Sequence, residues 1–222
     1  MTPEVSKIQS HSQHRCRLLL TAGLILLVVA GIWVWLGILK PRFVPRRFGV
    51  VEQGRIYRSG QLSSSFVKKV LVKYNIRVIV NLTPDDPKNA DRQAEEKAAT
   101  ELGIEVVRLP LNKDGTGDIH KYALAIAKIV EAEKKDKPVL VHCNGGTKRT
   151  GGVIAAYRLL VQKKDPDFVI SEIKHYGWKS KSDSALLTYL NSNMAELAEL
   201  LKKADVIREI PFPLPQLPQR KS

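Results

Sequence analysis

The sequence predicts an α/β protein in which helices cover a sheet. Short runs of β-branched and aliphatic residues, 77–82 and 104–109, are typical of buried strands, and each is followed by a stretch with helical spacing. A third run, 138–141, leads through a glycine-containing loop into the helical pattern of 151–160. Strands that alternate with helices favour a layered α/β sandwich.

The individual elements follow from apolar spacing and from start and stop signals. Phe66, Val70 and Leu71 repeat at helical spacing, Gly103 is a typical helix stop, and Asp118 is a typical helix N-cap. Helices are predicted over 63–74, 87–102, 118–135, 151–160, 167–176 and 184–203, and strands over 77–82, 104–109 and 138–141.

Composition divides the chain into five segments. They are an N-terminal tail (1–17), an apolar segment (18–39), a basic linker (40–50), one globular domain (51–205) and a proline-rich tail (206–222). The prolines spaced along 210–218 cannot continue a helix, so this end is expected to run extended. A passive tail is favoured over a ligand for a partner protein.

Residues 18–39 hold no charged side chain, and 22 helical residues are long enough to cross the hydrocarbon core of a bilayer. Trp33 and Trp35 lie towards the C-terminal end of this segment, where interfacial aromatic residues are common. The segment is longer than the apolar core of a typical signal peptide, so an uncleaved anchor is favoured over a cleaved signal. We therefore predict a single transmembrane helix from Leu18 to Leu39.

Basic residues flank this segment on both sides, with the larger cluster between Lys40 and Arg47. The positive-inside rule then favours a cytoplasmic domain. The two cysteines, Cys16 and Cys143, give no disulfide framework and favour the same compartment, although a periplasmic domain with one cysteine would also avoid disulfides.

The net charge of the chain is +14, and the first 49 residues hold seven basic side chains against one acidic. Positive charge of this kind attracts anionic lipid headgroups and phosphorylated substrates. No aromatic–basic platform or nucleic-acid motif accompanies it, so no nucleic acid is expected as a partner.

The stretch from His142 to Gly151 carries the chemistry. Its sequence, HCNGGTKRTG, places a cysteine after a buried strand and an arginine at the start of a helix. Backbone N–H groups of such a loop can converge on a phosphate, and the helix dipole adds positive potential. The same field is expected to lower the pKa of Cys143, and the planar guanidinium of Arg149 can hold two phosphate oxygens.

The pattern His-Cys-x5-Arg-Thr, with Gly146 third after the cysteine, resembles the signature loop of the cysteine-dependent protein tyrosine phosphatases. The resemblance is greatest to the compact dual-specificity branch and its bacterial and atypical members. It implies a three-layer fold with a central mixed sheet flanked by helices, no metal or other cofactor, and a phosphocysteine intermediate. It also implies that Thr150 helps the sulfur to leave, and that His142 orients the loop. The implied phosphate-binding residues are Asn144, Gly145, Gly146, Thr147, Lys148 and Arg149.

Two residues near this loop have open roles. Lys148 either faces the substrate or points to solvent. Arg58, in a Tyr-Arg-Ser-Gly-Gln segment that resembles bacterial family members, can touch substrate or pair with a loop group, and a structural role is favoured.

The resemblance further implies an aspartate general acid on a mobile loop, after a strand that ends in a Leu-Pro or Ile-Pro pair. Leu109-Pro110 fits this pair, and Asp114 is the best candidate, one residue after the position that an ungapped alignment gives. Asp118 is the alternative, but its position before a helix favours an N-cap. Asp85-Asp86 lies in a segment typical of a turn.

The sequence thus predicts a membrane-anchored phosphatase for phosphotyrosine, phosphoserine or phosphothreonine proteins. A phosphoinositide or inositol-polyphosphate phosphatase is the alternative, because Asn144 and the basic loop resemble the atypical branch. A pseudophosphatase that only binds phosphate groups is an alternative of another class. Sulfur or arsenate redox chemistry is a third, and Cys16 is a poor candidate for its resolving thiol.

Overall fold

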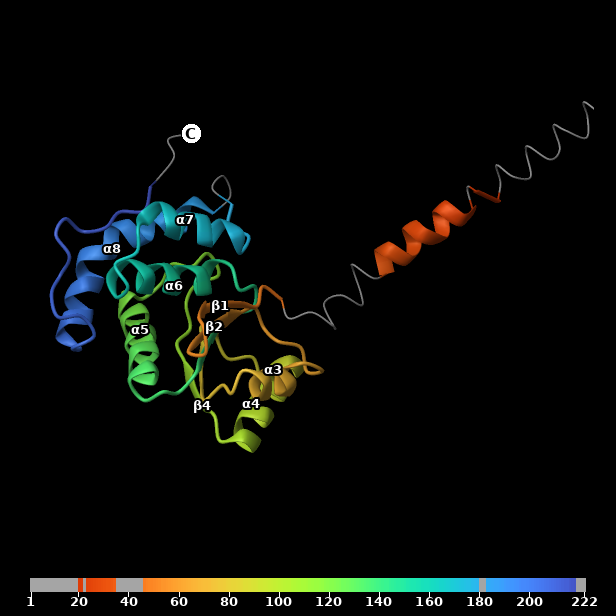
Figure 1. The fold of residues 1–222 in the computed structure, drawn as a ribbon, viewed down its shortest axis with the longest axis horizontal. Coiled ribbons are helices and arrows are strands. Elements are labelled where there is room, and N and C mark those ends of the chain that lie inside the picture. The colour runs from red at the N-terminus through yellow and green to blue at the C-terminus, as the bar shows by residue number, and fades with distance from the viewer. Residues whose placement is uncertain (1–19, 22, 35–45, 180–182, 219–222) are drawn as a thin grey trace, which may run out of the picture. The chain divides into compact units, whose positions relative to one another are not determined.

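The structure, a computed structural model, describes residues 20–21, 23–34, 46–179 and 183–218 (Figure 1). The chain divides into two units, Met1–Val44 and Pro45–Ser222. In the first unit the described residues are helical and exposed. No helix in the described ranges is both long and apolar enough to cross a membrane. The predicted transmembrane helix is therefore not confirmed, and the rest of 18–39 lies outside the described residues.

A five-stranded mixed sheet forms the centre of the second unit, in the order β1-β2-β5-β3-β4. The strands β1 (Gly49–Glu52) and β2 (Ile56–Ser59) pair antiparallel. The other neighbours pair in parallel, and these are β2 with β5 (Val139–His142), β5 with β3 (Val78–Asn81), and β3 with β4 (Glu105–Arg108). The carboxyl ends of four strands therefore meet at one edge of the sheet, where the signature loop begins.

Helices cover both faces of this sheet (Figure 1). On one face α3 (Val67–Lys73) and α4 (Ala90–Leu102) pack on the side chains of Tyr57, Ile79 and Leu140. The larger core lies on the other face, where Val80 and Val141 point. Its helices are α5 (Ile119–Lys134), α6 (Lys148–Leu160), α7 (Pro166–His175) and α8 (Ser184–Lys203).

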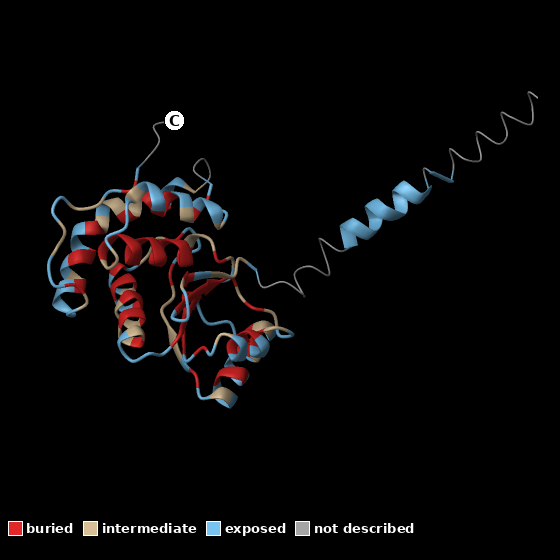
Figure 2. Cartoon of the chain, viewed as in Figure 1, coloured by how far each residue is buried: buried red, intermediate tan, exposed pale blue. Residues whose placement is uncertain are grey.

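Helix α6 is the most enclosed helix of this layer, because every residue from Arg149 to Leu160 is buried (Figure 2). It begins at Lys148, earlier than the predicted start at Gly151. The other predicted helices and strands are present within a few residues of their predicted bounds. The signature loop is thus joined to a fixed strand at one end and to a fully packed helix at the other.

The β1–β2 hairpin was not predicted. Its second strand carries Arg58 and Ser59, which are both fully buried, so the alternation of apolar and polar residues that marks a strand is missing.

The proline-rich end is packed at Leu217, so the predicted passive tail is wrong there. Asn191 of α8 donates from Nδ2 to the Leu217 carbonyl (2.9 Å) and accepts from the Leu217 N–H (2.8 Å). The Leu217 side chain is only 2% exposed and belongs to the larger core. The prediction that the prolines prevent a helix is confirmed, because residues 210–218 form neither helix nor strand.

Candidate active site

The signature loop lies between β5 and α6, at the carboxyl edge of the sheet. Cys143 directly follows β5 and is 2% exposed. Arg149 lies in the first turn of α6, is also buried, and donates from Nη1 to the Leu82 carbonyl (3.4 Å). No side chain caps the N-terminus of α6, so its first N–H groups are open to an anion.

The loop is held in shape by donors that bind its carbonyl groups. Three consecutive carbonyls accept from outside the loop, which leaves the N–H groups free to turn inward. The pairs are Gln61 N–H with Asn144 (3.1 Å), Arg47 Nη1 with Gly145 (2.8 Å) and Arg58 Nη2 with Gly146 (2.8 Å). Accordingly, the Gly146 N–H donates to Sγ of Cys143 at 3.2 Å.

The conformation of the signature loop requires a glycine at position 146. Its φ is +70°, and a Cβ there would lie 2.6 Å from the Gly60 nitrogen and 2.8 Å from the Ser59 carbonyl carbon. The loop backbone therefore packs directly on the end of β2.

Arg58, on β2, supports the signature loop through its hydrogen bond to the Gly146 carbonyl. Its side chain is fully buried, and its guanidinium lies 3.8 Å from the centroid of the Tyr176 ring. Burial lowers its pKa to about 10, so it keeps its charge at neutral pH. The predicted structural role of Arg58 agrees with these contacts.

The pKa of Cys143 is lowered from that of an ordinary thiol. Burial opposes the thiolate, but the hydroxyl and N–H of Thr150, the charge of Arg149 and the N–H of Gly146 outweigh burial. The Thr150 hydroxyl makes no regular hydrogen bond in the structure, yet as a nearby donor it favours the thiolate.

Asp114 lies in the loop that follows β4, exposed and next to the start of α6. The neighbouring Gly115 is so close to α6 that a Cβ there would lie 3.2 Å from the Lys148 carbonyl. The Asp114 carboxylate accepts from the N–H (3.0 Å) and hydroxyl (2.8 Å) of Thr116. These two hydrogen bonds, with a smaller contribution from the charge of Lys148, lower the pKa of Asp114.

The other candidate aspartates have structural partners. Asp118 caps α5, as expected, by accepting from the His120 N–H at 2.9 Å. Asp85 lies 3.2 Å from Nη1 of the buried Arg92. Asp114 is therefore the candidate whose loop packs against the start of α6, whereas the Asp118 carboxylate caps α5 and the Asp85 carboxylate pairs with Arg92.

Tyr122 joins the Asp114 loop to α6, and sequence analysis did not single it out. Its buried hydroxyl donates a short hydrogen bond to the Gly115 carbonyl. A Cβ on Gly152 of α6 would collide with this hydroxyl. The only available signal was the combination of a tyrosine on a predicted helix with two glycines, Gly115 in a loop and Gly152 in another helix.

Lys148 forms an ion pair and does not simply point to solvent, and its predicted role towards substrate stays a prediction. Its Nζ lies 2.7 Å from Oδ1 of Asp183, a side chain only 9% exposed. His142 lies on the opposite face of the sheet from Cys143, fully buried, with Nε2 at 3.1 Å from Oε2 of Glu95.

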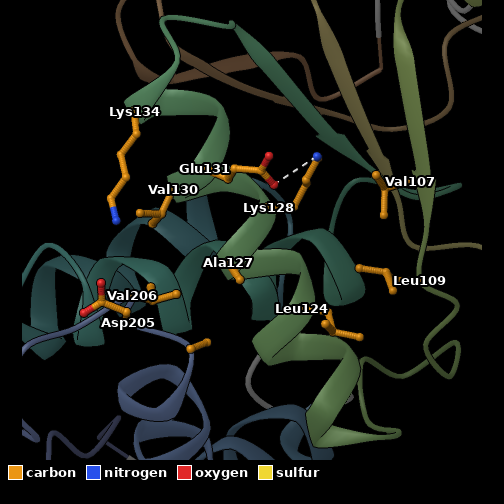
Figure 3. Close-up of a pocket in the computed structure, with 11 residues that line it drawn as sticks. Val107, Leu109, Leu124, Ala127, Lys128, Val130, Glu131, Lys134, Asp205 and Val206 are labelled. Carbon is orange, nitrogen blue, oxygen red and sulfur yellow. Dashed lines mark hydrogen bonds and ion pairs between the residues drawn. The ribbon is translucent and has the colours of Figure 1, made fainter.

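A separate groove of about 550 Å³ lies between β4, α5 and the end of α8 (Figure 3). Leu124, Ala127 and Val130 form its apolar floor, with Lys128 and Glu131 paired above them. None of its lining residues comes from the signature loop. Across the described part of the chain, no group of three or more His, Cys, Asp or Glu side chains is placed to hold a metal ion.

The part of the chain that holds the sheet and the signature loop matches a phosphatase family. The family described as "DSP-PTPase phosphatase fused to NAD+ Kinase" matches residues 48–187, which include the five strands of the sheet and the whole signature loop.

The chain belongs to this family.

Individual relatives support the assignment to this phosphatase family. The dual specificity protein phosphatase TpbA of Pseudomonas aeruginosa is 28% identical over 128 residues, which cover 58% of this chain and 54% of the relative. The chain thus matches about half the length of this curated relative. The crystal structure of TpbA superposes with a TM-score of 0.57 at 24% identity, covering 72% of this chain and 91% of the other.

The core catalytic domain of the phosphatase SIW14 from S. cerevisiae has the same fold. It superposes with a TM-score of 0.58 at 20% identity, covering 77% of this chain and 96% of the other. The α/β fold with a mixed central sheet and flanking helices, predicted from the sequence, is thereby confirmed.

Proposed function

We propose that this chain hydrolyses phosphate monoesters by attack of the Cys143 thiolate on phosphorus. The observation that carries the proposal is the cradle around Sγ, in which a loop N–H donates to the sulfur and Arg149 lies in the first turn of the following helix. Loop N–H groups and a guanidinium suit the three equatorial oxygens of a transferring phosphoryl group.

In the first step, Sγ of Cys143 forms a bond to phosphorus while the bond from phosphorus to the ester oxygen breaks. Asp114 gives its proton to the leaving oxygen, and Arg149 with the loop from Asn144 to Lys148 holds the phosphoryl oxygens. In the second step, water attacks the phosphocysteine, Asp114 takes the proton of that water, and the S–P bond breaks. Thr150 stabilises the sulfur as it leaves.

Asp114 acts in this scheme after substrate has bound. Without substrate, its hydrogen bonds with Thr116 favour the ionised form. A bound phosphate dianion next to the carboxylate favours protonation, because like charges at short range raise a carboxyl pKa. In this scheme Asp114 therefore takes up its proton when substrate binds.

Phosphorylated proteins are the substrates we propose first, because the curated relative TpbA is named a dual specificity protein phosphatase. Inositol phosphates or phosphoinositides are the second class. The net charge of +14 favours a polyanion, and the similarly folded SIW14 is titled a PP-IP phosphatase.

We also propose that residues 18–39 attach the phosphatase domain, residues 51–205, to a membrane. The support is the uncharged sequence of this segment and the exposure of its described helical residues. Carbonate-resistant sedimentation of the full chain with membranes, and its loss on deletion of 18–39, would test attachment. Protease access to the domain in intact cells would test the proposed cytoplasmic side.

Turnover of para-nitrophenyl phosphate by the full chain tests the chemistry, in reducing buffer with a metal chelator. We expect vanadate-sensitive turnover that Cys143→Ser abolishes and the matched Cys16→Ser retains. Retained turnover in Cys143→Ser would contradict the proposal. A panel of phosphopeptides and inositol phosphates then separates the two substrate classes. Phosphate binding without turnover would instead indicate a binding module.

A further inference from the structure

The buried carboxylate of Glu95, on α4, lies behind the signature loop on the opposite face of the sheet from Cys143. We propose that Glu95 is a positioning residue that fixes this loop through His142 and Gln61. The inference deepens the proposed function and rests on Cys143 as its nucleophile.

Helix α4 presents charge where a helix normally presents apolar residues. Arg92, Glu95, Ala98 and Ala99 share its buried face, and Glu95 is only 1% exposed. Burying a carboxylate is costly unless hydrogen bonds and opposite charge compensate it. A buried glutamate at this place therefore needs specific partners.

Three nitrogen atoms surround the Glu95 carboxylate. Asn81 Nδ2 donates to Oε1 at 3.0 Å, Gln61 Nε2 donates to Oε2 at 3.1 Å, and Nε2 of His142 lies 3.1 Å from Oε2. The His142 contact lies off the direction of a regular hydrogen bond, so it is a close polar contact. Burial opposes ionisation of Glu95, but these three partners outweigh it and lower the pKa of Glu95.

The orientation of the Asn81 amide is fixed by its neighbour Thr83. The Thr83 N–H donates to Oδ1 of Asn81 at 2.9 Å, and a main-chain N–H can only donate. The amide nitrogen of Asn81 therefore faces Glu95. The oxygen of residue 95 that faces Asn81 must therefore accept, while Gln61 Nε2 and His142 Nε2 both meet the second oxygen of Glu95.

Glu95 reaches the signature loop by two routes. His142 is the residue before Cys143, and its main chain pairs with Ser59 on one side and Asn81 on the other. Gln61 uses its side chain for Glu95 and its main-chain N–H for the Asn144 carbonyl, at 3.1 Å in both cases. One carboxylate thus holds the residues on both sides of Cys143.

Nε2 of His142 lies 3.1 Å from the Glu95 carboxylate, so the charge of Glu95 acts on the residue directly before Cys143. The other ionisable groups around Cys143 are Arg149 from α6, Arg58 from β2 and Tyr122 from α5. A substitution at Glu95 leaves these three groups in place. A change in the titration of Cys143 would therefore report on Glu95 and on its two routes to the loop, through His142 and Gln61.

The test is the pH dependence of Cys143 alkylation by iodoacetamide, in the full chain with Cys16→Ser. Glu95→Gln removes the carboxylate charge and one of the two accepting oxygens, so the contacts that hold the loop weaken. We expect the alkylation midpoint to move to higher pH and the rate at neutral pH to fall about tenfold. Glu95→Asp keeps the charge and should recover part of this loss.

Glu96→Gln is the matched control, because it removes the same charge from the exposed side of α4, where Glu96 pairs with Arg108 at 2.6 Å. It should leave the profile unchanged. A folded Glu95→Gln chain with the wild-type profile would overturn the inference. If Glu95→Gln does not fold, Gln61→Ala cuts one route and should still shift the midpoint; an unshifted midpoint there would also contradict it.

Alkylation needs no turnover, so the two proposals fail separately. A shifted profile in a chain without phosphatase activity would remove the proposed function and retain this inference. Normal turnover in the wild-type chain, with an unshifted alkylation profile in Glu95→Gln, would retain the proposed function and overturn this inference.

Discussion

At the scale of single residues, the sequence alone identifies Cys143 and Arg149 as members of one site. The cysteine, the arginine and Gly146 lie within one short motif, so their spacing predicts one cradle, and the structure brings them together at the end of β5. Glu95 and Tyr122 come from distant elements. Nothing local marks them, apart from a charged residue on the buried face of α4 and a tyrosine placed opposite Gly152.

Arg149→Lys tests the planar fork at this position. Lysine keeps the charge but holds one oxygen at a time, so transition-state binding should weaken. We expect kcat/KM for para-nitrophenyl phosphate to fall about 100-fold or more. Arg108→Lys, at an exposed ion pair on β4, is the control and should stay near wild type. Equal activity of the two variants would remove Arg149 from the phosphate site.

Asp114→Asn and Asp118→Asn separate the acid from the cap. Asp114→Asn should slow turnover about 100-fold for alkyl phosphates and less for nitrophenyl phosphate, whose leaving group needs little protonation. Asp118→Asn keeps an N-cap and should retain both activity and stability. The measurement is kcat for both substrates. Slow turnover in Asp118→Asn with normal turnover in Asp114→Asn would reverse the assignment.

At the scale of elements, apolar periodicity predicts most of the helices and the central strands, because their buried faces are apolar. Helix α4, which buries Arg92 and Glu95, is marked instead by its stop at Gly103. The same rule misses β2, since Arg58 and Ser59 occupy its buried positions and serve the loop. It also misses the packing of Leu217 on α8, which depends on the amide of Asn191 and not on a periodic pattern. The misses fall where polar groups replace apolar ones.

The contact of α5 with α6 gives a stability prediction. Gly152→Ala places a methyl group against the Tyr122 hydroxyl and should lower the free energy of unfolding by about 1–3 kcal/mol. Gly151→Ala is the matched control, because a Cβ there would lie at ordinary contact distance, 3.8 Å, from Arg58 and Ile173. Tyr122→Phe should recover part of the Gly152→Ala loss in urea unfolding. Equal stability of the two glycine variants would contradict the contact.

The Glu95 network predicts how stability changes with pH. Because the folded pKa of Glu95 is lowered, its contribution is fully present above its unfolded value of about 4.5 and is lost as pH falls through the folded value. Glu95→Gln should therefore be destabilised by about 3 kcal/mol at neutral pH. The gap between the two chains should narrow below pH ~4.5 in urea titrations. A gap that stays constant through this range would show that Glu95 is not ionised when folded.

At the scale of the whole molecule, the two helix layers on the sheet both support the signature loop at its carboxyl edge. Cys143 and the larger core lie on one face, while His142, Asn81 and Glu95 lie on the other. The reactive sulfur is therefore supported through the sheet from the layer that does not carry it. An alternating strand makes this possible, since consecutive residues point to opposite faces.

The net charge of +14 predicts a salt-dependent rate. Added salt should reduce kcat/KM more for inositol polyphosphates than for para-nitrophenyl phosphate, because screening weakens the attraction of a polyanion more strongly. The comparison is made between about 0.05 and 0.5 M sodium chloride. Identical salt dependence for both substrates would show that the charge does not act at the active site.

The covalent intermediate gives the most direct test of the account. The full chain is mixed with substrate, quenched within milliseconds in acid, digested, and examined by mass spectrometry. The account predicts a phosphate group on the peptide that contains Cys143, absent from Cys143→Ser. Turnover in the wild-type chain with phosphate on another residue, or undiminished turnover in Cys143→Ser, would contradict it.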